Sequence, residues 1–310
     1  MLNSTPVSYF VLGAFVDLGS LKYMMFVFLL LLYISIVVSN VLLVLVICVD
    51  RTLHEPMYLF LCPLFVNEVF GSSALYPLLL AQILEDVHVI STTMCFLQIF
   101  VLYSYGGIEF GTLAIMSYDR YLAICRPLQY NSIMTPCKIA ALTTLTWFYS
   151  IFMNLIFVYV LTPLKLCGNF IPKVYCDNFW VVRLSCSDTL LRNVFGLVNS
   201  SCRAVGIVML ILYSYGRILH VCFNSSASTR RKALSTCTPH LISLLNFSCG
   251  GLFEIIQSRF NMNAVPMVLR VFLSLYWLSL QPLINPLVYG LKTSKIRLVI
   301  RTLLCPKSVM

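Results

Sequence analysis

The chain has 310 residues, of which 60% are hydrophobic and only 10% are charged, and its formal net charge is +10. Soluble domains carry about 25% charged residues, and a soluble fold of this length would leave too much apolar surface in water. The composition therefore excludes an ordinary soluble domain and predicts a membrane protein with lipid around it. No basic stripe interleaved with aromatic residues is found in the sequence, so no nucleic-acid partner is expected.

Seven segments are apolar over the roughly 20 residues that a membrane helix needs. In chain order they are Tyr23–Val49, Met57–Leu84, Thr92–Ile124, Ile139–Leu164, Asn193–His220, Leu234–Ile256 and Val271–Leu291. The first, fourth and seventh contain no charged residue, whereas the others carry a few polar or charged ones, as expected of helices that face a polar interior. The sequence predicts one domain, with an outer N-terminal segment (1–22), a bundle (23–291) and an inner tail (292–310).

The orientation of the bundle is predicted from the short segments between the helices. Lys and Arg are more frequent on the side opposite the N-terminus, as at Arg230 and Arg231, so the positive-inside rule places the N-terminus outside. Asn3 begins an Asn-Ser-Thr glycosylation signal, which is useful only on the outer side. Residues 1–21 lack the pattern of a cleavable signal peptide, so the first apolar segment is expected to act as signal and anchor together.

The segment between the fourth and fifth helices is long, and loops of this length without helices or strands of their own are usually functional. It holds three cysteines on the oxidising outer side, and Cys95 at the outer end of the third helix makes their number even. Four cysteines allow three pairings. At the other end of the chain, Lys292–Leu304 has the pattern of an amphipathic helix on the inner leaflet. Cys305 is a candidate for palmitoylation, with an unmodified cysteine as the alternative.

Four motifs in a fixed order carry a resemblance to a known family. They are Leu53–Tyr58 (LHEPMY), Met116–Cys125 (MSYDRYLAIC), Lys232–His240 (KALSTCTPH) and Asn285–Gly290 (NPLVYG). Together they resemble the odorant receptors, which are rhodopsin-like G-protein-coupled receptors, and the first motif is most similar to the fish-type receptors. The resemblance covers about Asn3 to Arg297. It implies an all-α, rhodopsin-like bundle of seven transmembrane helices with a short amphipathic C-terminal helix.

The resemblance assigns an activation switch to the inner half of the bundle. Its residues are Asp119, Arg120, Tyr121, Tyr215, His240, Asn285, Pro286 and Tyr289. In the family, the arginine is held by the aspartate at rest and released toward a G protein on activation. The alternatives are a static pair at the membrane surface, where a long basic side chain reaches water, and a static proline kink.

A second set of polar residues is predicted to form an ion or proton site. Glu68 and Glu109 lie in the middle of the second and third helices, where an isolated charge costs roughly 2.5–3.5 kcal/mol on insertion scales. They are therefore expected to share a proton, to bind a cation such as sodium, or to form hydrogen bonds with Asn40 and Asn285. The family usually has Asp where this chain has Glu68, which leaves the sodium geometry and the shared proton as alternatives.

By resemblance, the outer cysteines pair as Cys95–Cys176 and Cys167–Cys186, and the ligand pocket lies under the long loop. The positions that match its lining are Leu102, Tyr103, Gly106, Gly107, Asn199, Ser200, Arg203, Ser248, Gly251, Ile255, Arg259 and Leu275. The two arginines in this set suggest a ligand with an acidic group, held by charge-assisted hydrogen bonds. The alternative is internal pairing, of Arg203 with Glu254 or of Arg259 with Asp177.

The expected function is therefore that of an odorant receptor at the plasma membrane of an olfactory sensory neuron. It would bind a small odorant and activate a stimulatory, olfactory-type heterotrimeric G protein, which raises cAMP. A rhodopsin-like receptor for a peptide or metabolite is less consistent with the family motifs. A transporter would be expected to show inverted repeats, and none is found in the sequence. An enzyme is not expected, because no nucleophile motif or metal-ligand spacing is present.

Overall fold

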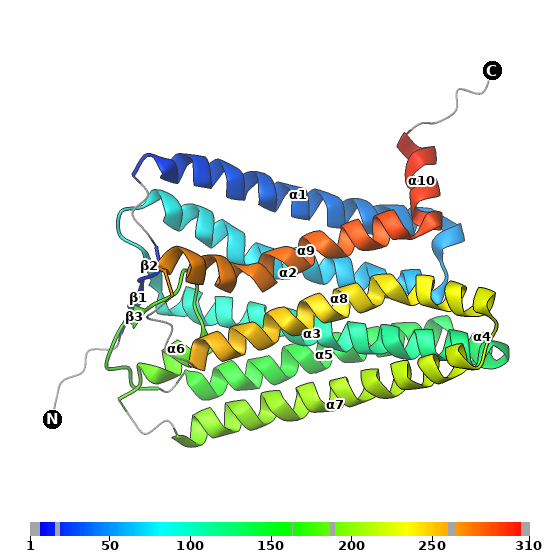
Figure 1. Ribbon diagram of the computed structural model, residues 1–310. Helices are drawn as coiled ribbons and strands as arrows, with labels where there is room; N and C mark the ends of the chain where they lie inside the picture. The colour runs from blue at the N-terminus through cyan, green and yellow to red at the C-terminus, as the bar shows by residue number, and fades with distance from the viewer. Residues whose placement is uncertain (1–6, 16–18, 163, 187–189, 260–264, 305–310) are drawn as a thin grey trace.

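The computed structural model describes residues 7–15, 19–162, 164–186, 190–259 and 265–304. Across these residues, seven long helices lie side by side as a bundle, with a small sheet at one end and a short helix, α10, at the other (Figure 1). The long helices are α1 (Leu21–Val49), α2 (Pro56–Leu84), α3 (Thr92–Cys125), α5 (Pro136–Leu161), α7 (Leu190–Phe223), α8 (Ala227–Arg259) and α9 (Met267–Lys292). The predicted seven-helix bundle is confirmed.

Among the described residues, six of these helices are long and apolar enough to cross a membrane, and α8 is the exception. Helix α8 begins seven residues before the predicted span, and this extension carries Arg230 and Arg231. Basic side chains of this kind are stable in water or among phosphates but not in a hydrocarbon layer. The inner end of α8 therefore extends beyond the bilayer, and its apolar span is the part that follows.

The helices start where local chemistry favours a start. Pro136 is the first residue of α5, a position where its missing N–H is not needed. The preceding Thr135 accepts a hydrogen bond from the Lys138 amide at 3.3 Å and so caps the helix. In α3, Ser91 accepts from the Met94 amide in the same way.

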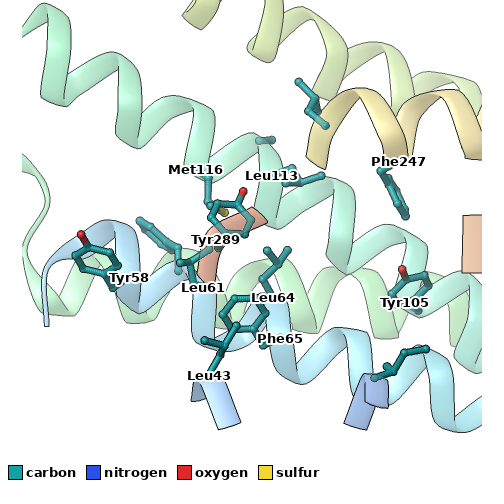
Figure 2. Close-up of a cluster of buried hydrophobic side chains, with 14 of the residues drawn as sticks. Leu43, Tyr58, Leu61, Leu64, Phe65, Tyr105, Leu113, Met116, Phe247 and Tyr289 are labelled. Atoms are coloured by element: carbon teal, nitrogen blue, oxygen red, sulfur yellow. The ribbon is translucent and has the colours of Figure 1, made fainter. Parts of the chain in front are cut away.

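The bundle carries apolar side chains on its outside and polar ones within. On α1, Phe28 and Leu31 are about 60% exposed (60% and 61%), whereas Asn40 is fully buried. Lipid contact explains the first group, because an exposed apolar surface of this extent is unstable in water. Helix α3 packs against α2, α5, α7 and α8 and thus occupies the centre. A buried apolar cluster, which includes Leu43, Phe65, Met116 and Tyr289, lies where α1, α2, α3 and α9 pack together (Figure 2).

Three short strands form a sheet over the outer end, in the order β2-β1-β3. Strand β1 (Tyr9–Leu12) pairs antiparallel with β2 (Val89–Ser91) and parallel with β3 (Phe170–Ile171), with Tyr9 opposite Ser91 and Val11 opposite Phe170. Phe10 and Leu12 are buried beneath it. The long loop thus contains β3 and a short helix, α6 (Asn178–Arg183), so the expectation of a loop without secondary structure was wrong.

The inner end consists of short turns and α10. The turns are η1 (Arg51–Leu53), η2 (Pro127–Gln129) and α4 (Tyr130–Ile133). Helix α10 (Ser294–Leu304) turns away from the direction of the bundle (Figure 1). It buries Ile296 and Val299 against the bundle and exposes Leu298, which is the amphipathic arrangement that the sequence predicts for the tail.

Candidate functional site

A polar core lies in the middle of the bundle, where the carboxyl groups of Glu68 in α2 and Glu109 in α3 are fully buried. The side-chain amide of Asn285 in α9 donates hydrogen bonds to both, at 3.0 Å to Glu109 Oε1. The Tyr105 hydroxyl donates to Glu68 Oε2 at 3.0 Å. Gly71 makes room for that ring, since a Cβ at this position would lie 2.5 Å from it. Three helices therefore meet at one pair of acids.

Two amides that the sequence analysis did not single out complete this core. Asn67 Nδ2 donates to Glu109 Oε2 at 3.0 Å, and Gln281 Nε2 donates to Glu109 Oε1 at 3.1 Å. Gln281 lies four residues before Asn285, so the two share one face of α9. A polar residue at this spacing within an apolar helix was a usable signal, whereas nothing in the sequence indicated Asn67 beyond its position next to Glu68.

Asn40 lies near this core, but its side chain donates to a backbone carbonyl and not to the two acids. Its side-chain amide donates to the backbone oxygen of Pro282 at 2.9 Å. Pro282 is four residues before Pro286, which has no N–H to offer that oxygen. Asn40 therefore satisfies the carbonyl that the proline in α9 leaves free, as kinked membrane helices require.

The inner switch residues form two linked contacts. Arg120 binds the Asp119 carboxylate through Nη2 and, at 3.0 Å, through Nε. The Tyr130 hydroxyl of α4 donates to the other Asp119 oxygen at 2.7 Å. Burial, and next the Asp119 carboxylate, raise the pKa of Tyr130, so this hydroxyl stays protonated as a donor. Tyr130 is thus a third member of the Asp119–Arg120 contact, although the sequence analysis did not include it.

His240 joins α8 to two other helices. Its Nε2 lies 2.9 Å from the Leu113 backbone oxygen, which can only accept, so Nε2 carries the proton. Its Nδ1 is then the acceptor for the Tyr215 hydroxyl of α7, and the two rings stack with centroids 5.8 Å apart. One histidine therefore holds the inner part of α8 against both α3 and α7. Tyr121 packs nearby against Tyr213, with ring centroids 5.9 Å apart.

A cavity of about 210 Å³ opens at the inner end of the bundle, beside Arg120 and His240. Its lining comes from α2, α3, α8 and the end of α9, and consists of Met57, Tyr58, Met116, Arg120, Ser235, Thr236, Pro239, His240, Tyr289, Lys292 and Thr293. The Tyr289 hydroxyl, on a side chain that is 2% exposed, makes no hydrogen bond of normal geometry to a described residue.

Some of the predicted pocket residues are described, and these lie in the outer half of the bundle. Leu102 is buried, the Tyr103 ring packs against Phe157 with centroids 5.9 Å apart, and Ser248 and Leu275 are half-buried. Gly107 faces α5, because a Cβ there would lie 3.1 Å from Ser150 Oγ.

The other two predicted glycines have more room. Beyond its own helix backbone, a Cβ at Gly106 would first meet Trp277 Cη2, at 3.8 Å, and a Cβ at Gly251 would meet no described atom within 4 Å. The side chains of the remaining predicted pocket residues lie outside the described part of the structure, as does Asn3. Those pocket residues are Asn199, Ser200, Arg203, Ile255 and Arg259.

An ion-pair cluster joins the long loop to α8. The Lys173 ammonium contacts Asp177 at 3.4 Å and also binds Glu254 of α8, whose Oε1 accepts from the Tyr175 hydroxyl at 2.7 Å. Burial alone would lower the pKa of Lys173, but Asp177 and Glu254 together outweigh it and raise that pKa. Lys173 therefore stays charged. The two acids considered as partners of Arg203 and Arg259 thus share Lys173, which the sequence analysis did not single out.

The loop is also fixed covalently. Disulfide bonds join Cys95 to Cys176 and Cys167 to Cys186, the pairing that the resemblance implies, with Cα–Cα distances of 5.4 and 5.0 Å. The Cys176 amide donates to Gln98 Oε1 at 2.8 Å. The loop is therefore attached to α3 by a covalent bond and to α8 by an ion pair.

We expect Lys173→Ala to destabilise the outer end by about 3–5 kcal/mol, because it removes the cation that the buried Asp177 and Glu254 carboxylates share. Glu254→Ala should cost less, because Lys173 keeps its contact with Asp177 at 3.4 Å. The double variant should be more stable than the sum of the two losses predicts, with a coupling of about 0.5–3 kcal/mol. Thermal unfolding of the purified receptor measures all three variants. Strictly additive losses would show that the two residues do not act as a pair.

Comparison with known proteins agrees with this architecture. The olfactory receptor family profile matches residues 29–307. The chain is 34% identical to human (Homo sapiens) olfactory receptor 6N1 over 96% of each chain, and 33% identical to mouse (Mus musculus) olfactory receptor 6E1 over 97% of this chain and 96% of that one. It is 35% identical to human olfactory receptor 52D1 over 86% of this chain and 84% of the relative.

A solved structure gives the fold independently. Squid rhodopsin superposes with a TM-score of 0.74 over 93% of this chain and 82% of its own, at 16% sequence identity. At that identity the likeness shows the fold alone, which is the seven-helix bundle of a multi-pass membrane protein. The match to the olfactory receptor profile and to relatives along nearly the whole chain shows more. The chain belongs to the olfactory receptor family, whose members are receptors and not enzymes.

Proposed function

We propose that this receptor binds a small odorant in the outer half of its bundle and activates a stimulatory, olfactory-type heterotrimeric G protein, which raises cAMP. Its place is the plasma membrane of an olfactory sensory neuron, with the N-terminus outside. The observation that carries the coupling is the position of His240, which ties α8 to α3 and α7 next to Arg120. Such a contact defines two arrangements of α8, and a ligand that prefers the open one shifts the population toward it.

The ligand we propose carries an acidic group. The ion-pair cluster (Lys173, Asp177 and Glu254) and the predicted pocket lining (Arg203 and Arg259) together contain five charged residues. Their formal charges sum to +1 (three cations and two acids), so one ligand carboxylate would balance them. Lys173 pairs with both acids, so the two acids do not need the arginines as partners, which supports this count.

A cell-based cAMP assay tests the function. The receptor is expressed with a reporter and exposed to a panel of straight-chain carboxylic acids, the corresponding alcohols and aldehydes, and amino acids. We expect responses to acids that exceed those to their neutral analogues. A preference for the neutral compounds would refute the acidic ligand while supporting the odorant receptor, whereas signalling through a different G protein would refute the proposed coupling.

We also propose that the Glu68–Glu109 pair holds either a shared proton or a sodium ion. The residues fit a cation: two carboxylates close enough to share one amide offer hard oxygen ligands, and the buried Asn67 Oδ1 has no partner among the described residues. Two acids this close in an apolar bundle cannot both be charged without such a partner.

Sodium replacement distinguishes these alternatives. If the site takes sodium, exchanging sodium for choline should change basal cAMP in the wild type, and Glu68→Ala or Glu109→Ala should remove that change. The measurement is basal cAMP per receptor at the cell surface in both media. A sodium effect that persists in both variants would place the ion elsewhere, and a wild type that does not respond would favour the shared proton.

A further inference from the structure

The inner cavity has a chemistry that the proposed function does not use. Apart from its apolar residues and His240, every group in the lining is a hydroxyl or a cation: the hydroxyls of Tyr58, Ser235, Thr236, Tyr289 and Thr293, and the charged groups of Arg120 and Lys292. No carboxylate is among the described lining residues. Hydroxyls, guanidinium and ammonium groups all donate hydrogen bonds, so the cavity offers donors to an occupant that is rich in acceptors.

Two of these donors are available. The Tyr289 hydroxyl is buried and lies near Ser243, but it makes no hydrogen bond of normal geometry to a described residue, so an acceptor in the cavity would satisfy it. Arg120 uses Nε and Nη2 for Asp119, so Nη1 is left over as a donor within the described structure. Lys292 adds a full positive charge at the mouth, where its side chain is exposed.

The size of the cavity limits what it accepts. At about 210 Å³ it is smaller than the roughly 300–1,000 Å³ of pockets for drug-sized ligands. The cavity in this closed arrangement therefore has room for one small anionic group.

We propose that this cavity is a binding site for a phosphate monoester on the inner side of the membrane, held between Arg120 and Lys292 with the Tyr289 hydroxyl as a further donor. A phosphate monoester has nearly two negative charges and three strong acceptor oxygens, which match these donors. The group has two possible sources, the headgroup of an inner-leaflet phosphoinositide and a soluble inositol phosphate. Because Ser235 and Thr236 of α8 also line the cavity, an occupant held by α3 and α9 contacts α8 in the closed arrangement and disfavours its outward movement; this consequence rests on the proposed G-protein coupling, whereas the binding does not.

The test uses the purified full-length receptor in lipid nanodiscs and follows its thermal unfolding. One arm adds soluble inositol trisphosphate, and the other includes phosphatidylinositol bisphosphate in the bilayer. The variant is Lys292→Gln, which removes the charge at the mouth. The matched control is Lys295→Gln, three residues further on, whose ammonium pairs with Glu55 at 2.5 Å on the exposed surface outside the cavity.

We expect the probe to raise the unfolding temperature of the wild type and of Lys295→Gln, and Lys292→Gln to weaken binding about tenfold, as loss of a charge-assisted bond does. Tyr289→Phe, which removes only the hydroxyl, should also weaken it. A shift with the soluble probe identifies a soluble source, and a shift only with the lipid identifies the headgroup. No shift in either arm, or equal loss in Lys292→Gln and Lys295→Gln, would overturn the proposal. None of these outcomes decides whether the receptor responds to odorants, because the cAMP assay measures that response separately.

Discussion

Replacing Arg120 with Ala is expected to reduce odorant-stimulated and basal cAMP to background while the receptor still reaches the cell surface. Arg120 is 8% exposed and lies in the lining of the inner cavity, where an outward movement of α8 would uncover it. Removing its guanidinium deletes the charged donor that, in the proposed coupling, this cavity would offer to the G protein. Asp119 loses its cation, which costs stability, but it keeps the hydrogen bond from Tyr130 at 2.7 Å, so we expect folded receptor still to reach the surface.

The matched control is Arg126→Ala, which removes an exposed arginine just beyond the end of the same helix. It should retain most of the signal. Asp119→Asn should act in the opposite direction and raise basal cAMP, because Arg120 loses the carboxylate that holds it. All values are normalised to surface receptor measured through an N-terminal epitope tag. Wild-type signalling by Arg120→Ala, or a loss explained fully by missing surface receptor, would contradict this role.

The bundle was predictable because a membrane imposes a simple rule on composition. Twenty or so apolar residues are enough to mark a span, and the limits of α1 and α2 lie within two residues of the predicted ones. The exception is instructive. The inner end of α8 is polar, so an apolar run misses its first turns although the helix continues through them.

The outer sheet was not predictable from the sequence. Its strands have four, three and two residues, too short for an alternating pattern to be recognised. They come from three distant segments, so the pairing of Val11 with Phe170 depends on the completed bundle and on the disulfides. The N-terminal segment therefore had no local signal for its place as the central strand.

The ion-pair cluster of Lys173, Asp177 and Glu254 was likewise not predictable from the sequence. A lysine in a polar loop is usually solvated, and Lys173 gives no sign of burial in the sequence around it. Its partner Glu254 is 81 residues away and was considered only as a partner for Arg203. By contrast, the acids of the polar core were recognisable, because a carboxyl group in an apolar span requires a partner wherever it lies.

Replacing Cys176 with Ser is expected to abolish folded receptor at the cell surface. The Cys95–Cys176 bond closes a segment with a sequence separation of 81 residues, and the chain-entropy model gives about 4.5 kcal/mol for such a loop. Both cysteines are almost fully buried, and the Cys176 amide also binds Gln98. Without the bond, the loop that carries Lys173 loses its covalent attachment to α3, and only non-covalent contacts remain, among them the Cys176–Gln98 hydrogen bond, the pairing of β3 with β1 and the ion pair with Glu254.

The second disulfide provides the internal comparison. Cys167–Cys186 spans only 19 residues, for which the same model gives about 3.2 kcal/mol, and it ties the loop to itself instead of to a helix. Cys167→Ser should therefore lower surface expression and thermal stability by less than Cys176→Ser. Cys95→Ser and the Cys95→Ser/Cys176→Ser double variant should match Cys176→Ser, because a single bond is lost in all three. Flow cytometry of tagged receptor, with and without cell permeabilisation, measures the folded fraction. Equal effects of Cys167→Ser and Cys176→Ser would mean that the attachment to α3 is not what stabilises the outer end.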